Sequence, residues 1–160
     1  MSILAWSEEL ELQQPQMDAT HREFVQHLQS TESALAAPEP QWLAHYDALL
    51  QHTVEHFAQE ERWMHDIGFA PENCHARQHA SVLQAMREVR EQLHARPDPT
   101  LLRQLLLELG QWFSLHARSM DAALCETVNA AGYDPASGAC EHRLAPDAPA
   151  RHTCGNSSCA

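Results

Sequence analysis

Residues 56–79, HFAQEERWMHDIGFAPENCHARQH, decide the fold of this chain. A histidine and a glutamate stand four residues apart at its start (His56 and Glu60), and two histidines stand four apart at its end (His75 and His79). Side chains four residues apart project from the same face of an α-helix. The stretch therefore predicts two helices that each present a pair of metal-ligand side chains on one face.

Apolar residues on both sides of that stretch recur at steps of three, four or seven, which is the period of amphipathic helices. Asp18 is expected to cap the first helix, Gly68 to end the second, and Pro71 to lie in the first turn of the third. No segment shows the sustained apolar-polar alternation of a strand. The pattern predicts four helices, at about 18–36, 40–66, 71–94 and 99–130.

The predicted inward stripes of these helices carry histidines and acids at positions where leucine would be expected. An isolated buried charge is costly, so such residues need partners, and a metal ion is the obvious one. Helices of ~20–30 residues with short connections favour an all-α fold, an up-down-up-down antiparallel four-helix bundle. We expect the bundle over residues 1–132, with an N-terminal arm over 1–17, and a flexible C-terminal tail over 133–160.

Composition excludes several classes of protein. The chain has 160 residues, enough for one domain, with 22 acids, 10 bases and a net charge of -12. Nucleic acids and anionic membrane surfaces both require a basic face, so neither is expected as a partner. No apolar run approaches the ~20 residues of a membrane span, and the first residues lack the features of a signal peptide, so we expect a cytoplasmic protein. The 12 histidines beside 22 acids are typical of a metal protein.

Candidate metal ligands occur on the inward stripe of every predicted helix. His116 and Asp121 are five residues apart, ~140° beyond a full helical turn, so Asp121 is expected to approach from the edge of its stripe. Five imidazoles and two carboxylates exceed what one iron ion takes, whereas two ions sharing carboxylates accommodate them, and this donor set suits iron better than a thiolate-seeking metal. The candidates are His21, His56, Glu60, His75, His79, His116 and Asp121.

These residues and their spacing resemble those of bacterial hemerythrins. The resemblance covers residues 1–132, and it implies a four-helix bundle with a non-haem di-iron centre that binds O₂ reversibly for storage, delivery or sensing. Besides the candidate ligands, the match is carried by Trp6-Ser7-Glu8, Met17-Asp18-x-x-His21, His56-Phe57-x-x-Glu60-Glu61, Met64-x-x-x-Gly68-Phe69 and Trp112-Phe113-x-x-His116.

The resemblance also implies a role for each ligand. It assigns three histidines to one iron: His75, His79 and His116. It assigns two to the other: His21 and His56. Glu60, Asp121 and a hydroxide bridge the two irons, and the second iron keeps an open position at which O₂ binds as a hydroperoxide. The expected walls of the O₂ pocket, for which plain core packing is the alternative interpretation, are Phe24, Phe57, Trp112, Phe113 and Met120.

The other histidines are expected to lie away from this centre. His27, His45, His65 and His94 fall off the stripes and are interpreted as surface residues. His52 precedes His56 by one turn, so it is either another surface residue or an outer hydrogen-bond partner of the ligands.

The tail contains its own candidate ligands, in the strings Cys140-x-His142 and His152-x-Cys154, followed by Cys159. They could bind Zn²⁺, although the spacing matches no zinc finger. Cys154 and Cys159 could instead form a redox disulfide, or all of these residues could lie in a mobile tail. A protein partner could engage this segment.

Two other functions compete with O₂ binding. A di-iron enzyme (a peroxidase, oxidase or nitric oxide reductase) would need an open substrate pocket and a proton donor, and no acid beyond the ligands is apparent. A regulatory protein would use the tail cysteines to report iron or redox state. The histidine-rich ligand set favours O₂ binding without enzymatic turnover.

Overall fold

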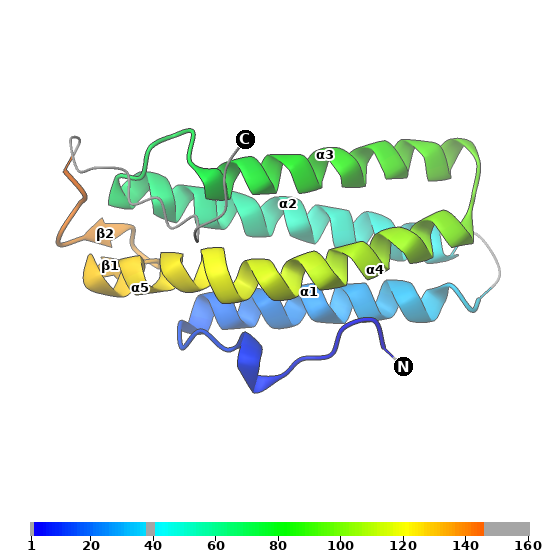
Figure 1. Cartoon of the computed structure of the whole chain (residues 1–160), viewed down its shortest axis with the longest axis horizontal. Helices are drawn as coiled ribbons and strands as arrows, with labels where there is room; N and C mark the ends of the chain where they lie inside the picture. The colour runs from blue at the N-terminus through cyan, green and yellow to red at the C-terminus, as the bar shows by residue number, and fades with distance from the viewer. Residues whose placement is uncertain (1, 38–40, 146–160) are drawn as a thin grey trace.

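The computed structural model describes residues 2–37 and 41–145 (Figure 1). A short 3-10 turn, η1, and a π-helical turn, η2, accompany the helices, and a small hairpin follows them. The elements are η1 (Glu8–Leu10), α1 (Pro15–Ala34), α2 (Gln41–Ile67), α3 (Cys74–Ala95), α4 (Pro99–His116), η2 (Ala117–Asp121), α5 (Ala122–Ala130), β1 (Tyr133–Asp134) and β2 (Ala139–Cys140).

Helices α1 to α4 lie side by side and alternate in direction, and α5 continues the line of α4 beyond η2 (Figure 1). This confirms the predicted all-α, antiparallel four-helix bundle. The N-terminal arm runs along the outside of α1 and α4, where Ile3 packs against Gly110. None of the helices in residues 2–37 and 41–145 combines the length and apolar character needed to cross a membrane.

Two apolar clusters form the core, one toward each end of the bundle. The larger one includes Phe24, Leu28, Leu49 and Phe113, and the smaller one includes Trp63. Burial of each such side chain stabilises the fold by ~1.5–3 kcal/mol. Helices α1 and α2 each contribute buried residues to both clusters. On these two helices, the buried histidines and acids lie between the residues of one cluster and those of the other. The core therefore holds a polar layer in place at a fixed level of the bundle.

The connection between α2 and α3 is determined by Gly68. Its φ of 105° lies in the left-handed region, which glycine adopts without strain. Its backbone N–H and that of Phe69 both donate to the carbonyl of Met64, a typical helix stop. Gly68 thus ends α2 as predicted, but α3 begins later than expected, because Asn73 caps it through Ala76 N–H and leaves Pro71 outside the helix.

The start of α1 also differs from the prediction. Gln14 is the N-cap, since its side chain accepts a hydrogen bond of 2.6 Å from the backbone N–H of Met17. Asp18, the predicted cap, lies inside the helix and accepts from Leu12 N–H at 2.8 Å. Its carboxylate secures the end of the N-terminal arm to the first turn of α1.

Residues 133–144 pack against the end of the bundle, where a flexible tail without strands was expected. Tyr133 and Cys140 pair in the antiparallel hairpin, and the Tyr133 hydroxyl donates to the Asp66 carboxylate on α2 at 2.9 Å. The backbone N–H of Leu144 donates to the carbonyl of Ile67 at 2.8 Å. Strands of two residues are too short to show an alternating pattern, so the sequence gives no sign of this hairpin.

Candidate metal centre

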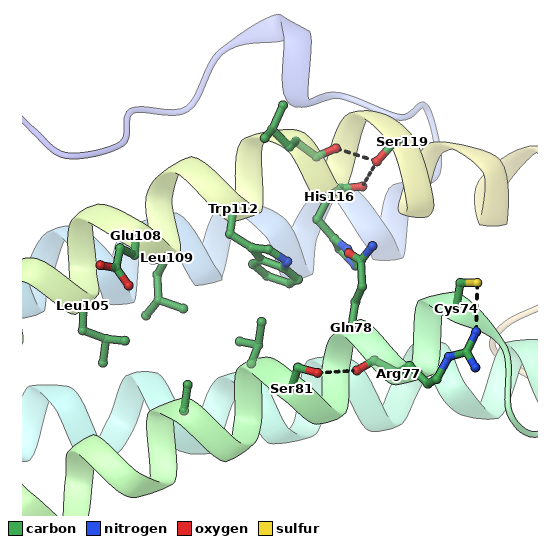
Figure 2. Close-up of a pocket in the computed structure, with 13 residues that line it drawn as sticks. Cys74, Arg77, Gln78, Ser81, Leu105, Glu108, Leu109, Trp112, His116 and Ser119 are labelled. Carbon is green, nitrogen blue, oxygen red and sulfur yellow. Dashed lines mark hydrogen bonds between the residues drawn. The ribbon is translucent and has the colours of Figure 1, made fainter. Parts of the chain in front are cut away.

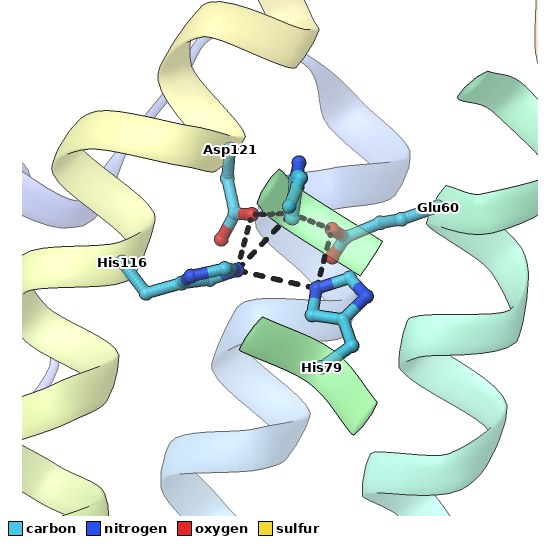
Figure 3. Close-up of side chains that lie close together, drawn as sticks. Glu60, His79, His116 and Asp121 are labelled. Carbon is cyan, nitrogen blue, oxygen red and sulfur yellow. Dashed lines mark hydrogen bonds and ion pairs between the residues drawn. The ribbon is translucent and has the colours of Figure 1, made fainter. Parts of the chain in front are cut away.

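The seven predicted ligands meet inside the bundle, and all of them are buried. They come from α1, α2, α3, the end of α4, and η2. Figure 3 shows Glu60, His79, His116 and Asp121 pointing toward one another from different elements. The ligand atoms of the seven fall into two groups that share Glu60, each compact enough to hold one cation.

The first group, which we call the three-histidine group, consists of His75, His79 and His116. Their Nε2 atoms converge: that of His116 lies 3.1 Å from that of His75 and 3.2 Å from that of His79. These three nitrogens, with one oxygen each from Glu60 and Asp121, all lie within 4.8 Å of one another. Five donor atoms therefore surround one point.

The second group, the two-histidine group, consists of His21 on α1 and His56 on α2. Their rings meet edge to face with centroids 5.1 Å apart. His56 Nε2 lies 2.5 Å from Glu60 Oε1, and His21 Nε2 lies 3.2 Å from Asp121 Oδ2. This group thus brings fewer imidazoles than the first to the same two carboxylates.

Each of the two carboxylates directs one oxygen to each group. Glu60 Oε2 lies 3.0 Å from His75 Nε2, while its Oε1 faces His56. Asp121 Oδ1 lies 3.1 Å from His116 Nε2, while its Oδ2 faces His21. Glu60 and Asp121 therefore lie between the two histidine groups and face both of them.

The π-helical turn η2 explains how Asp121 reaches the centre. Backbone N–H of Ala122 donates to the carbonyl of Ala117, five residues back, so this turn accommodates one more residue than an α-helical turn. The extra residue brings Asp121 onto the face that carries His116. Asp121 was expected to lean in from the edge of a regular helix; a local change of helix type places it there instead.

The donor atoms fit a cation better than they fit one another. Both nitrogens of His21 and His56 and both oxygens of Glu60 and Asp121 are buried and have no hydrogen-bond partner among the described residues. Buried polar groups left unpaired are costly. Imidazole nitrogens and carboxylate oxygens that face each other in this way are satisfied together by metal ions, for which neutral imidazole and ionised carboxylate are the binding forms.

The two carboxylates are ionised even without metal. Burial and the neighbouring Asp121 oppose ionisation of Glu60, but the surrounding imidazoles hold its pKa well below its usual range. Burial likewise opposes ionisation of Asp121, and His116 and His21 outweigh it. For His75, burial opposes the charged form, yet Asp121 and Glu60 raise the pKa of its imidazole to about 9. A proton on His75 thus balances part of the negative charge in the metal-free protein.

Gln78 orients one of the ligands from outside. Nδ1–H of His116 donates to its side-chain oxygen at 2.9 Å, which leaves the Nε2 lone pair directed to the centre. Glu61 makes a longer contact with another ligand, since its carboxylate lies 3.4 Å from His79 Nδ1. Neither was predicted, although Gln78 lies directly before His79 and Glu61 directly after Glu60 in the sequence.

The predicted pocket residues divide between the two groups. Phe113 stacks on Phe24, with centroids 4.4 Å apart, and its ring meets His21 edge to face. The ring of Phe24 lies 6.4 Å from that of His56. Both phenylalanines are almost completely buried. They border the two-histidine group with buried apolar side chains.

The other predicted pocket residues lie elsewhere. Phe57 stacks on His79 with centroids 3.8 Å apart, and Trp112 stacks on His116 at 4.4 Å. Both therefore pack against the three-histidine group, although the Phe57 ring also lies 5.4 Å from that of His56. Met120 is half-buried in η2 and takes no part in these ring contacts.

A groove of about 940 Å³ runs between α3 and α4 and reaches the three-histidine group (Figure 2). His116, Gln78 and Trp112 contribute to its inner wall, and apolar side chains such as Leu105 and Leu109 line it along α4. The opening was not predicted, because it depends on how far two helices separate.

The tail candidates are not joined by the structure. Neither Cys140 nor His142 belongs to a potential metal-binding group within residues 2–37 and 41–145. The Cys140 thiol instead contacts the carbonyl of Ala131 at 3.7 Å. The remaining predicted tail ligands, His152, Cys154 and Cys159, lie outside the described residues.

His52 does not contact the ligands through a hydrogen bond. Its Nε2 lies 3.2 Å from the carbonyl of Thr20, to which it donates. Burial, together with His56 and His27, lowers the pKa of His52 to about 4, so the ring is neutral at neutral pH. This hydrogen bond thus joins α2 to α1 at Thr20, the residue that precedes His21.

Fold and centre together define a helical-bundle protein with a buried cation-binding site made of histidines and carboxylates. A model of the family "Hemerythrin HHE cation binding domain" matches residues 14–127. The chain is 36% identical to a bacteriohemerythrin of Ralstonia nicotianae over 134 residues, 84% of this chain and 95% of that one. It is 26% identical to bacteriohemerythrins of Stenotrophomonas maltophilia, over 81% of this chain and 84% of that one, and of Pseudomonas aeruginosa, over 80% and 83%. The chain belongs to the hemerythrin family.

Proposed function

We propose that the protein is a non-haem di-iron protein that binds O₂ reversibly, with one iron at each histidine group. The observation that carries this proposal is that Glu60 and Asp121 each direct one oxygen to the three-histidine group and the other to the two-histidine group. A site for a single ion does not require carboxylates that each face two separate groups of histidines. Bridging carboxylates hold two cations at a fixed separation and lower their mutual repulsion.

The donor set favours iron and gives the two positions different tasks. Two ferrous ions would supply the two electrons that reversible O₂ binding requires. His75, His79 and His116 fill more positions around one ion, and the two-histidine group leaves an open position at the other. We infer that O₂ binds on the side of His21 and His56.

The chain's apolar side chains protect that position. Phe24 and Phe113 border the two-histidine group and are 0% and 1% exposed, so water and protons have little access to it from the core. Such exclusion slows the irreversible oxidation that water and protons promote. The phenylalanines thus favour release of O₂ over its reduction.

An enzymatic function is the second candidate, and the groove between α3 and α4 is the observation that favours it. This groove reaches His116 and has room for a substrate larger than O₂. It opens on the three-histidine group, however, which already has more ligands. Catalytic turnover would therefore require a ligand of that group to move.

The deciding experiment is anaerobic loading of the full-length protein with Fe²⁺, followed by repeated cycles of air and argon. We expect about two irons per chain and a visible absorption band that appears in air and disappears under argon. His56→Ala should keep one iron and lose the band, whereas His65→Ala, at a side chain 82% exposed, should retain both. An iron content of one, or a spectrum that changes once and never returns, would overturn the proposal. Steady consumption of H₂O₂ or nitric oxide would support the enzyme instead.

A further inference from the structure

Asp121 reaches the centre only because η2 is π-helical. It lies at the end of this turn and projects toward His116 (Figure 3). In a regular α-helix, a separation of five residues would turn Asp121 ~140° away from the face of His116. Turns of the π type are rare, because the α form is more favourable, so a π turn that persists has contacts that stabilise it. The contacts that hold η2 therefore decide where Asp121 lies.

Side chains of η2 stabilise the wider turn from within. In a regular α-helix, the carbonyls of Ser114 and Leu115 would accept hydrogen bonds from the backbone N–H groups of residues 118 and 119. Here Arg118 Nε–H donates to the Ser114 carbonyl at 2.9 Å, and the Ser119 hydroxyl donates to the Leu115 carbonyl at 2.7 Å. Side-chain donors thus reach into the backbone ladder at the point where the helix changes type.

The N-terminal arm holds the same turn from outside. Its short helix η1 packs against η2. Arg118 Nη1 lies 3.3 Å from the Glu9 carboxylate in η1, so one guanidinium contacts both the arm and the end of α4. Leu10, also in η1, is 3% exposed and belongs to the same apolar cluster as Ala117, the first residue of η2. The arm therefore contacts the turn through an ion pair and a buried leucine.

Hydrogen bonds on both sides of η1 fix the arm to α1. Before η1, the backbone N–H of Ile3 donates to the Glu32 carboxylate at 2.9 Å. After η1, the backbone N–H of Leu12 donates to the Asp18 carboxylate at 2.8 Å. The arm thus reaches from α1 to η2 as a brace that is attached at both of its ends.

We propose that Leu10 and Arg118 are positioning residues for the metal centre. The docked arm keeps η2 in its π form, and η2 keeps Asp121 between the two histidine groups. Release of the arm lets the turn shift and withdraws a carboxylate that faces both groups, so cation affinity falls. The consequence for O₂ binding rests on the proposed function, whereas the effect on cation affinity does not.

Zn²⁺ affinity of the full-length protein, measured by competition with a chelator, tests this role. We expect Leu10→Ala to lower the affinity about tenfold and Leu10→Met to restore it. Arg118→Ala should lower it by a smaller factor, because the side chain is 48% exposed and exposed ion pairs are weak. Leu102→Ala truncates another buried leucine of the same cluster, near the start of α4, and is the matched control. It should lower the melting temperature and keep the wild-type affinity.

Hydrogen exchange in the metal-free protein gives a second readout. Amides of residues 117–122 should exchange faster in Leu10→Ala and Arg118→Ala than in the wild type, because local opening of η2 becomes easier. If Leu10→Ala does not fold, Arg118→Ala carries both measurements.

Wild-type affinity and wild-type exchange in the folded variants would overturn the positioning role. Equal losses of affinity in Leu10→Ala and Leu102→Ala would overturn it too, since lost packing would then explain both. Zn²⁺ binding involves no O₂, so the two proposals can fail separately. A protein whose zinc affinity depends on the arm but whose spectrum does not cycle between air and argon would support this inference and contradict the proposed function.

Discussion

The two histidine groups of the centre share their carboxylates but differ in the side chains that support them. The three-histidine group is supported from outside by Gln78, and aromatic rings stack on two of its members. The Nδ1 atoms of His21 and His56 have no hydrogen-bond partner in the described chain, and phenylalanine rings border them. One group is built with polar support and the other is enclosed by apolar side chains.

The surroundings of each group favour a different role toward a bound metal ion. Outer hydrogen bonds fix the ring orientation of a ligand and raise its basicity, which favours firm retention of a metal ion. An apolar enclosure with fewer ligands instead leaves coordination incomplete and excludes water. Under the proposed function, the three-histidine group would hold its ion firmly, and the two-histidine group would exchange a ligand.

Removing a shared carboxylate should have the largest effect, because it breaks both groups at once. We expect Glu60→Ala to lose both metal ions, since Glu60 faces His56 with one oxygen and His75 with the other. Metal analysis after loading and desalting checks this. Glu126→Ala, an exposed glutamate on α5, serves as the control and should retain both ions. Retention of one ion by Glu60→Ala would show that the two groups bind independently.

Removing one histidine from each group should separate them. We expect His79→Ala and His56→Ala each to keep one ion, and the ion that remains in His56→Ala to be held more tightly, because it sits in the three-histidine group. Competition with a chelator measures the two affinities. Equal affinities in the two variants would contradict the difference in support between the groups.

The sequence predicted the bundle and the convergence of the candidate ligands because both depend on one regular period. Residues such as Trp42, Tyr46 and Leu49 recur at helical steps and are all buried, as expected. His56 and Glu60 occupy the same stripe, so the period that predicts the core also directs these ligands into it. Where a helix is regular, spacing in the sequence translates directly into position in space.

The sequence did not predict the features that depend on departures from that period or on distant contacts. The π-helical turn before Asp121 breaks the regular helix, and its only sign in the sequence is the five-residue spacing from His116. The contact between Gln78 and His116 joins α3 and α4, so it requires knowledge of how the two helices face each other. The two histidine groups differ in such contacts between separate helices.

The outer support of the three-histidine group can be removed alone. Gln78→Ala deletes the acceptor of the His116 Nδ1–H bond and leaves every ligand in place. We expect affinity to fall by about 10–100-fold at one of the two metal positions and to stay unchanged at the other. Chelator competition on the loaded protein resolves the two steps. A loss that is equal at both positions would mean that Gln78 supports the fold and not one group.

The smallest expected effect is a pH dependence that belongs to the three-histidine group through His75. Asp121 and Glu60 raise the pKa of this imidazole to about 9 in the metal-free protein, against 6.5 for an ordinary histidine. A metal ion must displace that proton, so its affinity should rise about tenfold per pH unit from 7 to 8 and level off above 9.

Stability of the metal-free protein should change in the opposite direction. A raised pKa means that the protonated His75 stabilises the fold fully below pH 6.5, and that this stabilisation is lost as the pH rises through 9. The melting temperature of the metal-free protein should therefore fall over that range, while metal affinity rises. Calorimetry in buffers of different ionisation enthalpy should detect about one proton released per chain on metal binding at pH 7.5. No proton release would show that His75 is already neutral in the metal-free protein. The negative charges of Glu60 and Asp121 would then not be balanced by a proton on His75.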